Sequence, residues 1–375
     1  MEKNITLNSS HHRFRQLDSL RGIAALAVYF SHYIGILPHR LTPHIISVTP
    51  VGMLFNGYAA VMFFFVLSGF VLSLPYVNHD KPISLTAFYI KRVFRIYPVL
   101  IFAIIFSVVI KLYLYDKEAM AASQIWFKSY WAWDWSTQNI HTIIRTFFLL
   151  GPNFNSRLID PPVWSLVVEI QMSILLPFFI RIASRNGVLL NIALLIVIGF
   201  LTYQSSNWAL SVFYMGILMA KYKDVILSAM VNWNRWVLIA IATIAYIMYD
   251  NNYVFLYTYI KLSPDNKMLI NLFGAFSSGV LMLIIMAQKN ISRFLEHRVF
   301  IFMGNISYSF YLIHMPLLIS FASIFTYRFV FSPGYIFLAS VTTAVTISYL
   351  MFITIEKPFQ SIGKQIAAKF KMLNI

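Results

Sequence analysis

A few ionisable side chains lie inside long apolar runs of the sequence, where a charge is costly unless it has a partner or a water-filled cavity, and four of them could carry chemistry. They are Arg21, His32, Glu169 and His314. Arg21 and His32 are separated by three helical turns, so both project from nearly the same helix face, roughly 16 Å apart along the axis. The spacing predicts a fixed cation at one end of a tunnel and a proton-accepting imidazole toward the other.

A carboxylate beside one of these imidazoles would complete an acid–base unit. Counting along the apolar runs places Glu169 and His314 at much the same depth as His32. A carboxylate that accepts a hydrogen bond from one imidazole nitrogen fixes the tautomer and leaves the other nitrogen free to take a proton. We therefore expect His32 to pair with Glu169. The alternative is that these residues only hydrogen-bond across a helix bundle and hold it together.

A second cationic pair, Arg92 and Arg95, comes at the start of the third apolar run. Residues three apart stack on one helical face, and planar guanidinium groups suit bidentate binding of phosphate. The pair therefore predicts a site for a phosphorylated cytosolic donor. The alternative is an anchor to anionic lipid head groups, which is the interpretation we prefer for the neighbouring Lys91.

The composition indicates the kind of protein that must position these side chains. Hydrophobic residues make up 59% of the 375 residues and charged residues only 11%, against about 25% charged residues in a soluble domain. The chain is therefore predicted to be a membrane protein, and its net charge of +16 to record cations held on one side of a bilayer rather than a nucleic-acid partner. Because there is no cysteine, disulfides, thiol chemistry and cysteine-ligated metal sites are excluded.

The apolar runs have about the length that a bilayer-spanning helix requires. They lie at residues 20–38, 58–77, 93–115, 162–181, 188–204, 207–220, 236–250, 268–288, 302–325 and 334–355. Lys and Arg are concentrated in the loops that this order assigns to the cytoplasm, as the positive-inside rule requires. The sequence thus predicts an all-α polytopic membrane protein of about ten transmembrane helices with both termini cytoplasmic.

No repeat, low-complexity tract or linker divides the chain, so residues 1–375 are predicted to form a single transmembrane domain. The longest external segment, residues 116–161, contains Trp126, Trp131, Trp133 and Trp135. These side chains are expected in an interfacial aromatic belt, with stacking on sugar rings as the alternative.

Motifs spread over nearly the whole chain resemble the acyltransferase 3 family of integral membrane O-acyltransferases. They are Leu17–Gly22 with an R-x10-H spacing from Arg21 to His32, Phe64–Phe70, the RxxR pair Arg92 and Arg95, Trp164–Leu166 with Glu169, Ser307–Ser309 with Tyr311, Leu312 and His314, and Glu356–Pro358. The resemblance implies transfer of an acyl group, usually acetyl, from cytoplasmic acyl-CoA to a hydroxyl of an extracytoplasmic or membrane-bound acceptor.

Carried onto this chain, the resemblance makes His32 the catalytic base, with Arg21 as its motif partner and Glu169 beside them. Arg92 and Arg95 would contact the phosphates of coenzyme A. Acetyl-CoA is expected as a co-substrate, with no permanently bound cofactor and no metal. Transfer through an acyl-enzyme and direct transfer to an acceptor hydroxyl both remain open.

An additional polar site is predicted around His314, Ser307 and Trp164. The sequence departs from the family pattern after Glu169, where Ile170–Ser173 replaces a stretch that is often aromatic. Some members also carry a soluble extracytoplasmic esterase-like domain, and we expect none attached here. The chain would then act alone or with a separate extracytoplasmic partner.

The preferred function is an O-acetyltransferase of the bacterial inner membrane that modifies a lipid-linked or nascent surface glycan, such as the O-antigen of lipopolysaccharide or an exopolysaccharide. The acceptor could instead be a small hydroxylated metabolite or a lipid. From a different class, the same Arg and His residues could line a proton-coupled transporter. Against the transporter, the sequence lacks two halves with matching broken helices.

Overall fold

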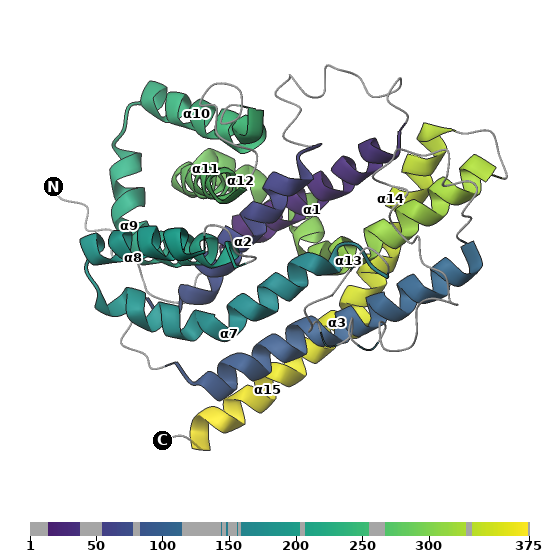
Figure 1. Ribbon diagram of the computed structural model, residues 1–375, viewed down its shortest axis with the longest axis horizontal. Helices are drawn as coiled ribbons and strands as arrows, with labels where there is room; N and C mark the ends of the chain where they lie inside the picture. The colour runs from purple at the N-terminus through teal and green to yellow at the C-terminus, as the bar shows by residue number, and fades with distance from the viewer. Residues whose placement is uncertain are drawn as a thin grey trace.

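The computed structural model describes residues 14–37, 55–77, 83–114, 144, 148, 156, 159–202, 207–254, 267–327 and 332–373. These residues form helices joined by turns, with no strand among them (Figure 1). The helices are α1 (Arg15–Ile36), α2 (Gly57–Ser73), α3 (Leu85–Leu114), α7 (Val163–Arg185), α8 (Val188–Leu201), α9 (Ala209–Val231), α10 (Arg235–Val254), α11 (Lys267–Ala287), α12 (Lys289–Leu295), α13 (Arg298–Tyr327), α14 (Pro333–Met351), the π-helix η6 (Phe352–Glu356) and α15 (Lys357–Leu373). The predicted all-α class is confirmed. The tryptophans of residues 116–161 lie outside the described residues.

Each of the ten predicted apolar runs coincides with a helix. Within the described residues, four helical stretches are long and apolar enough to cross a membrane, at Leu85–Leu114, Val163–Arg185, Arg298–Phe325 and Pro333–Phe370. Helices α11 and α12, bent by 98° at their junction, make a fifth if they form one span. These helices support a membrane protein. The number of ten spans and the cytoplasmic position of both termini stay predictions.

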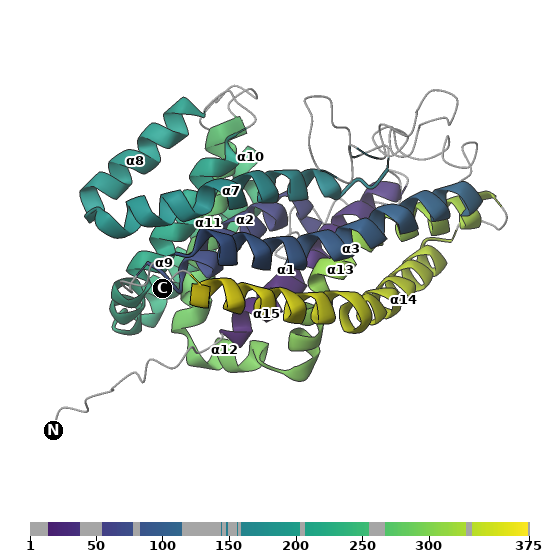
Figure 2. The same ribbon diagram turned by 90° about the horizontal axis from the view of Figure 1, so that it is seen from below.

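Two helix boundaries differ from those expected. Helix α3 begins at Leu85, so Arg92 and Arg95 lie within it rather than before it. No glycine or proline interrupts residues 85–97, and Arg and Lys are good helix formers, so the helix extends past the apolar run. At the other end of the chain, the helix continues beyond residue 355 through η6 into α15, which packs along α3 (Figure 2).

The centre of the molecule is built on the pair α1 and α13. Gly22 lies against Gly304, and His32 lies against His314. Both contacts join residues at the same offset in sequence, so the two helices run parallel. Helix α2 packs on α1 and, through Gly69, against Phe213 of α9. Helices α3 and α7 close the group, while α8 to α11 gather at one end of it (Figure 1).

The cytoplasmic end predicted for α7 is fixed by side chains from the next two helices. The Lys221 ammonium of α9 donates to the carbonyl oxygens of Ala183 at 2.7 Å and Asn186 at 2.5 Å. The Asn191 amide of α8 donates to the same two carbonyls at 3.1 and 3.0 Å. Carbonyls at the end of a helix lack intrahelical partners, so these bonds hold α7 in place.

Close approach of α1 and α13 depends on Gly22. A Cβ atom at Gly22 would lie 2.6 Å from the backbone nitrogen of Gly304. Because a backbone atom cannot move without shifting its helix, we expect Gly22→Ala to lower the free energy of unfolding by about 1–3 kcal/mol. The measurement is the thermal unfolding of the detergent-purified protein. Gly334→Ala is the control, since nothing lies within 4 Å of a Cβ there, and equal stability of the two variants would contradict the prediction.

Candidate functional site

A cavity lies between α1, α2, α3, α7 and α13, which carry five of the six motifs identified in the sequence. Its polar lining residues are Arg21, Ser68, Arg92, Arg95, Ser165, Glu169, Ser307, Tyr308 and Tyr311. Apolar side chains of α2, among them Phe64 and Phe65, form much of the remaining wall. On α7, Glu169 marks a charged end of this cavity, and Ser165, one turn earlier, marks the end at which hydroxyl groups of α7 and α13 meet.

At the charged end, Arg92 is held by α7. Its Nη2 donates to Glu169 Oε1 at 2.5 Å, and its Nε donates to Ser173 Oγ at 3.1 Å. Ser173 Oγ donates in turn to the Glu169 carbonyl at 2.6 Å. Arg92 is only 7% exposed, so this ion pair replaces the hydration that both groups lose on burial. The pair joins α3 to α7 and neutralises one of the cavity's three arginines.

The other two arginines differ in their partners. Arg21 Nη1 lies 3.3 Å from Asp18 Oδ1 on the same helix. Arg95 forms no hydrogen bond or ion pair with any residue that the structure describes. Of the three guanidinium groups it is thus the one most open to an anionic ligand.

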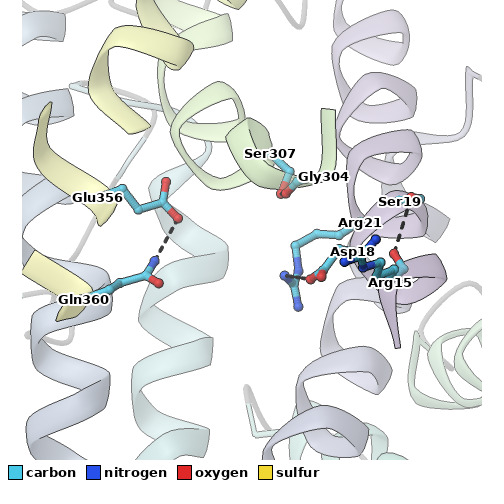
Figure 3. A network of polar contacts seen from close by, with 8 residues as sticks. All are labelled: Arg15, Asp18, Ser19, Arg21, Gly304, Ser307, Glu356 and Gln360. Atoms are coloured by element: carbon cyan, nitrogen blue, oxygen red, sulfur yellow. Dashed lines mark hydrogen bonds and ion pairs between the residues drawn. The ribbon is translucent and has the colours of Figure 1, made fainter. Parts of the chain in front are cut away.

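Glu356 provides a second carboxylate near this end, at the last position of η6. It accepts hydrogen bonds from Ser309 Oγ at 2.9 Å and Gln360 Nε2 at 3.0 Å, and it interacts electrostatically with Arg95 and Arg21. Figure 3 shows Arg21 extending from α1 toward the space that separates it from the Glu356–Gln360 pair. A π-turn often marks a functional position in a helix, and here it places Glu356 among the arginines.

At the opposite end of the cavity, Ser165 Oγ and the Tyr311 hydroxyl form a hydrogen bond of 2.8 Å. Ser165 is one helical turn before Glu169 on α7, and Tyr311 is one turn after Ser307 on α13. Tyr311 thus lines the cavity and also lies against the histidines, because its ring is 5.8 Å from the ring of His314.

The two histidines stack on each other, with ring centroids 5.4 Å apart. His314 Nδ1 contacts the carbonyl oxygens of Tyr311 at 2.7 Å and Phe310 at 3.2 Å. Since a carbonyl oxygen can only accept, Nδ1 carries the hydrogen and Nε2 carries the lone pair of the neutral ring. His314 Nε2 is buried and has no hydrogen-bond partner among the described residues. It is placed to accept a proton from a bound hydroxyl.

The expected pair of His32 and Glu169 is not the one observed. Glu169 binds Arg92, and His32 lies against His314. Counting residues from the start of an apolar run gave Glu169 and His32 the same depth, but Glu169 is one turn beyond Ser165 toward the charged end. The guanidinium that it meets there is a stronger partner for a buried carboxylate than a neutral imidazole.

Of the remaining predicted site residues, one lines the cavity and one does not. Ser307 lines the cavity and donates to the carbonyl of Gly304 at 2.8 Å. Trp164 does not line it: its side chain is exposed and its ring meets Phe65 edge-on at 6.4 Å. Tyr308, which the sequence did not single out as a site residue, lines the cavity and donates to the Ile96 carbonyl at 2.9 Å. Its place in the motif beside Ser307 was the available signal.

Asp160 was also missed. It precedes α7 in the sequence Ile159-Asp160-Pro161-Pro162, and its side chain is fully buried. Burial raises the pKa of the Asp160 carboxyl well above its ordinary value. The carboxyl also interacts electrostatically with Tyr311, and Asp160 precedes α7 on the side of Ser165 that is away from Glu169.

Comparison with known proteins finds the family that these motifs resemble. The profile of the acyltransferase 3 family, described as an acyltransferase domain, matches residues 14–353. O-acetyltransferase OatA of Staphylococcus aureus is 25% identical over 389 residues, covering 93% of this chain and 58% of OatA. YrhL of Bacillus subtilis, named as a candidate peptidoglycan O-acetyltransferase, is 27% identical over 186 residues, covering 46% of this chain and 24% of YrhL.

The chain thus spans 58% of the length of OatA and less of YrhL. No solved structure matches it. The family profile covers all five helices that line the cavity, together with both histidines. The chain belongs to the acyltransferase 3 family.

Proposed function

We propose that this protein transfers an acetyl group from cytoplasmic acetyl-CoA to a hydroxyl of a bacterial surface glycan. The observation that carries the proposal is the cavity, which has arginines at one end and the stacked imidazoles of His32 and His314 just beyond the other. Membership of the acyltransferase 3 family and the names of OatA and YrhL support acyl transfer to oxygen. The inner membrane is the proposed location, because acetyl-CoA is cytosolic and surface glycans are assembled on lipid carriers.

The donor is proposed to bind with its phosphates at the charged end. Arg95 is the best candidate for a phosphate contact, because it lines the cavity and forms no hydrogen bond or ion pair with a described residue. Arg21 and Glu356 set the charge around it, and the apolar wall from α2 suits the uncharged arm of the donor. The eleven-residue offset from Arg21 to His32 spans roughly 16 Å, which lets one extended molecule reach from the arginines toward the histidines.

The reaction is proposed to occur beside His32 and His314. The acceptor oxygen attacks the thioester carbon, its proton passes to an imidazole, and the carbon–sulfur bond breaks. The thiolate of coenzyme A then takes up a proton. We assign His32 as the catalytic base of this step, with His314 stacked on it as the second proton-accepting group. Only one of two imidazoles so close together can carry a charge at a time, so the proton must leave before the next cycle.

The acceptor is proposed to be a lipid-linked or nascent surface glycan. The name of YrhL directs attention to peptidoglycan, beside the O-antigen and exopolysaccharide that the sequence suggested. Each of these acceptors presents sugar hydroxyls at the outer face of the inner membrane. The transporter alternative has no observation that favours it over acyl transfer, since the family profile covers most of the chain.

Loss of either imidazole should stop transfer without unfolding the protein. We expect His32→Ala and His314→Asn each to lower transfer of radiolabelled acetyl from acetyl-CoA into membrane glycan at least about 100-fold. Asparagine at residue 314 can still donate to the Tyr311 carbonyl, so it removes the Nε2 lone pair while keeping the local hydrogen bond. Activity close to that of the wild type in His32→Ala, at equal protein level in the membrane, would refute the role of His32.

The two arginines of α3 should behave differently. Arg95→Ala is expected to raise the acetyl-CoA concentration needed for half-maximal rate about tenfold or more, with a smaller effect on the maximal rate. Arg92→Ala should instead lower the thermal unfolding temperature, because it leaves Glu169 half-buried without its partner. Lys91→Ala, on the exposed side of the same helix, is the control for both measurements. If the acetyl-CoA concentration for half-maximal rate is unchanged in Arg95→Ala, Arg95 does not bind the donor and the lipid-anchoring alternative applies to it.

A further inference from the structure

The turn that holds Asp160 is fixed on both sides by hydrogen bonds. The amide of Val163 donates to the Asp160 carbonyl at 3.1 Å, and Ser156 Oγ donates to the Pro161 carbonyl at 3.1 Å. Ser107 Oγ of α3 donates to the carbonyl of Ile159. Two prolines follow Asp160, and each fixes its own φ angle. The backbone therefore sets the position of the Asp160 side chain.

That side chain ends in a place without partners. Asp160 is 0% exposed, and neither carboxyl oxygen has a hydrogen-bond partner among the described residues. No other Asp or Glu in the described part of the chain is both buried and unpartnered. A buried polar group without a partner costs about 1–3 kcal/mol or more, so Asp160 destabilises the folded state where an apolar residue would not.

A second unpartnered acceptor, on His314, lies next to Tyr311. Asp160 interacts electrostatically with the Tyr311 hydroxyl, which is bonded to Ser165, and the Tyr311 ring meets the His314 ring. His314 Nε2 presents a lone pair to this region, because Nδ1 is committed to backbone carbonyls. Two buried groups that can accept hydrogen bonds thus flank one tyrosine. A ligand that brings several O–H donors would satisfy both.

We propose that Asp160 is the acceptor-binding residue of this site, and that it holds one hydroxyl of a polyhydroxylated acceptor while a second hydroxyl is presented to the histidines. The inference rests on the proposed acyl transfer and specifies how its acceptor is recognised. Asp160 takes no part in the bond changes: its carboxyl accepts a hydrogen bond from a hydroxyl that is not acylated. An acceptor with a single hydroxyl could satisfy only one of the two groups.

The position of Asp160 relative to the cavity suits this role. Ser165 and Tyr311 line the cavity and Asp160 does not, because Asp160 precedes α7 on the side of Ser165 that is away from Glu169 and the arginines. The donor and the acceptor can then bind on opposite sides of the Ser165–Tyr311 pair. Their reacting groups would meet once the hydrogen bond between these two hydroxyl groups breaks. Asp160 would set the orientation of the acceptor without contacting the donor. Its loss should therefore change use of the acceptor and leave use of the donor intact.

The test compares Asp160→Asn with wild type and with the control Asp224→Asn, whose carboxylate is exposed and paired with its neighbour Lys223. The first measurement is thermal unfolding of each detergent-purified protein, which requires no knowledge of the acceptor. The second is transfer of radiolabelled acetyl from acetyl-CoA into the glycan and lipid fractions of washed membranes, over a range of acetyl-CoA concentrations.

We expect Asp160→Asn to unfold at the same temperature as wild type or higher, because it removes an unpartnered carboxyl from the interior. Transfer should fall roughly ten- to hundredfold, the loss expected when a substrate hydroxyl loses its hydrogen bond to a buried carboxyl. The acetyl-CoA concentration for half-maximal rate should not change. Asp224→Asn should match wild type in every measurement.

Other results would overturn the proposal in distinguishable ways. A lower unfolding temperature for Asp160→Asn would make Asp160 a structural residue, and transfer within twofold of wild type would remove it from the site; both leave the proposed acyl transfer standing. Label found only in a lipid with a single hydroxyl would exclude the polyhydroxylated acceptor. No labelled product from the wild type would overturn the proposed function, and the role of Asp160 with it.

Discussion

Ionisable groups inside an apolar bundle need partners, and in this protein that constraint decides how the cavity is built. The ion pair of Arg92 and Glu169 is the central case. Each group would be costly alone in the interior, and together with Ser173 they satisfy one another and join α3 to α7. Because Glu169 is committed to Arg92, Arg95 is left with an open guanidinium and His32 with another neighbour. Arg92 and Arg95 therefore differ because only Arg92 forms an ion pair with the Glu169 carboxylate.

Much of the helical arrangement could be predicted because apolar length is a strong signal. All ten runs coincide with helices, and the position of Arg21 and His32 on one helix followed from their spacing alone. The ends of the helices were harder to predict from the sequence. Charged residues such as Arg92 are good helix formers that do not add to an apolar run, so α3 begins earlier than hydropathy indicates. Helix η6 was hidden for another reason, because a π-turn depends on how Glu356 packs.

The composition of the site was predicted better than its pairing. Arg21, Arg92, Arg95, Glu169 and Ser307 all line one cavity, and His32 and His314 are in contact beyond it. Which of them bind one another depends on helix packing, which the sequence does not encode locally. An error of one turn moves a side chain about 5 Å, enough to exchange an imidazole for a guanidinium as the partner of Glu169. Asp160 escaped notice because it lies before a helix rather than inside an apolar run.

The two ends of the cavity follow opposite rules, and the contrast carries information about the ligands. At the charged end, Glu169 pairs with Arg92, and Glu356 interacts electrostatically with the other two arginines. The proposed donor would therefore meet arginines whose charge is already largely neutralised. At the other end, Asp160 and His314 Nε2 are buried without described partners, and both can accept hydrogen bonds. A site that gathers unpartnered acceptors in a region closed to water is complementary to a molecule rich in hydroxyl donors. It would discriminate strongly against an acceptor that lacks one of them, because the unmatched group would remain buried and unsatisfied.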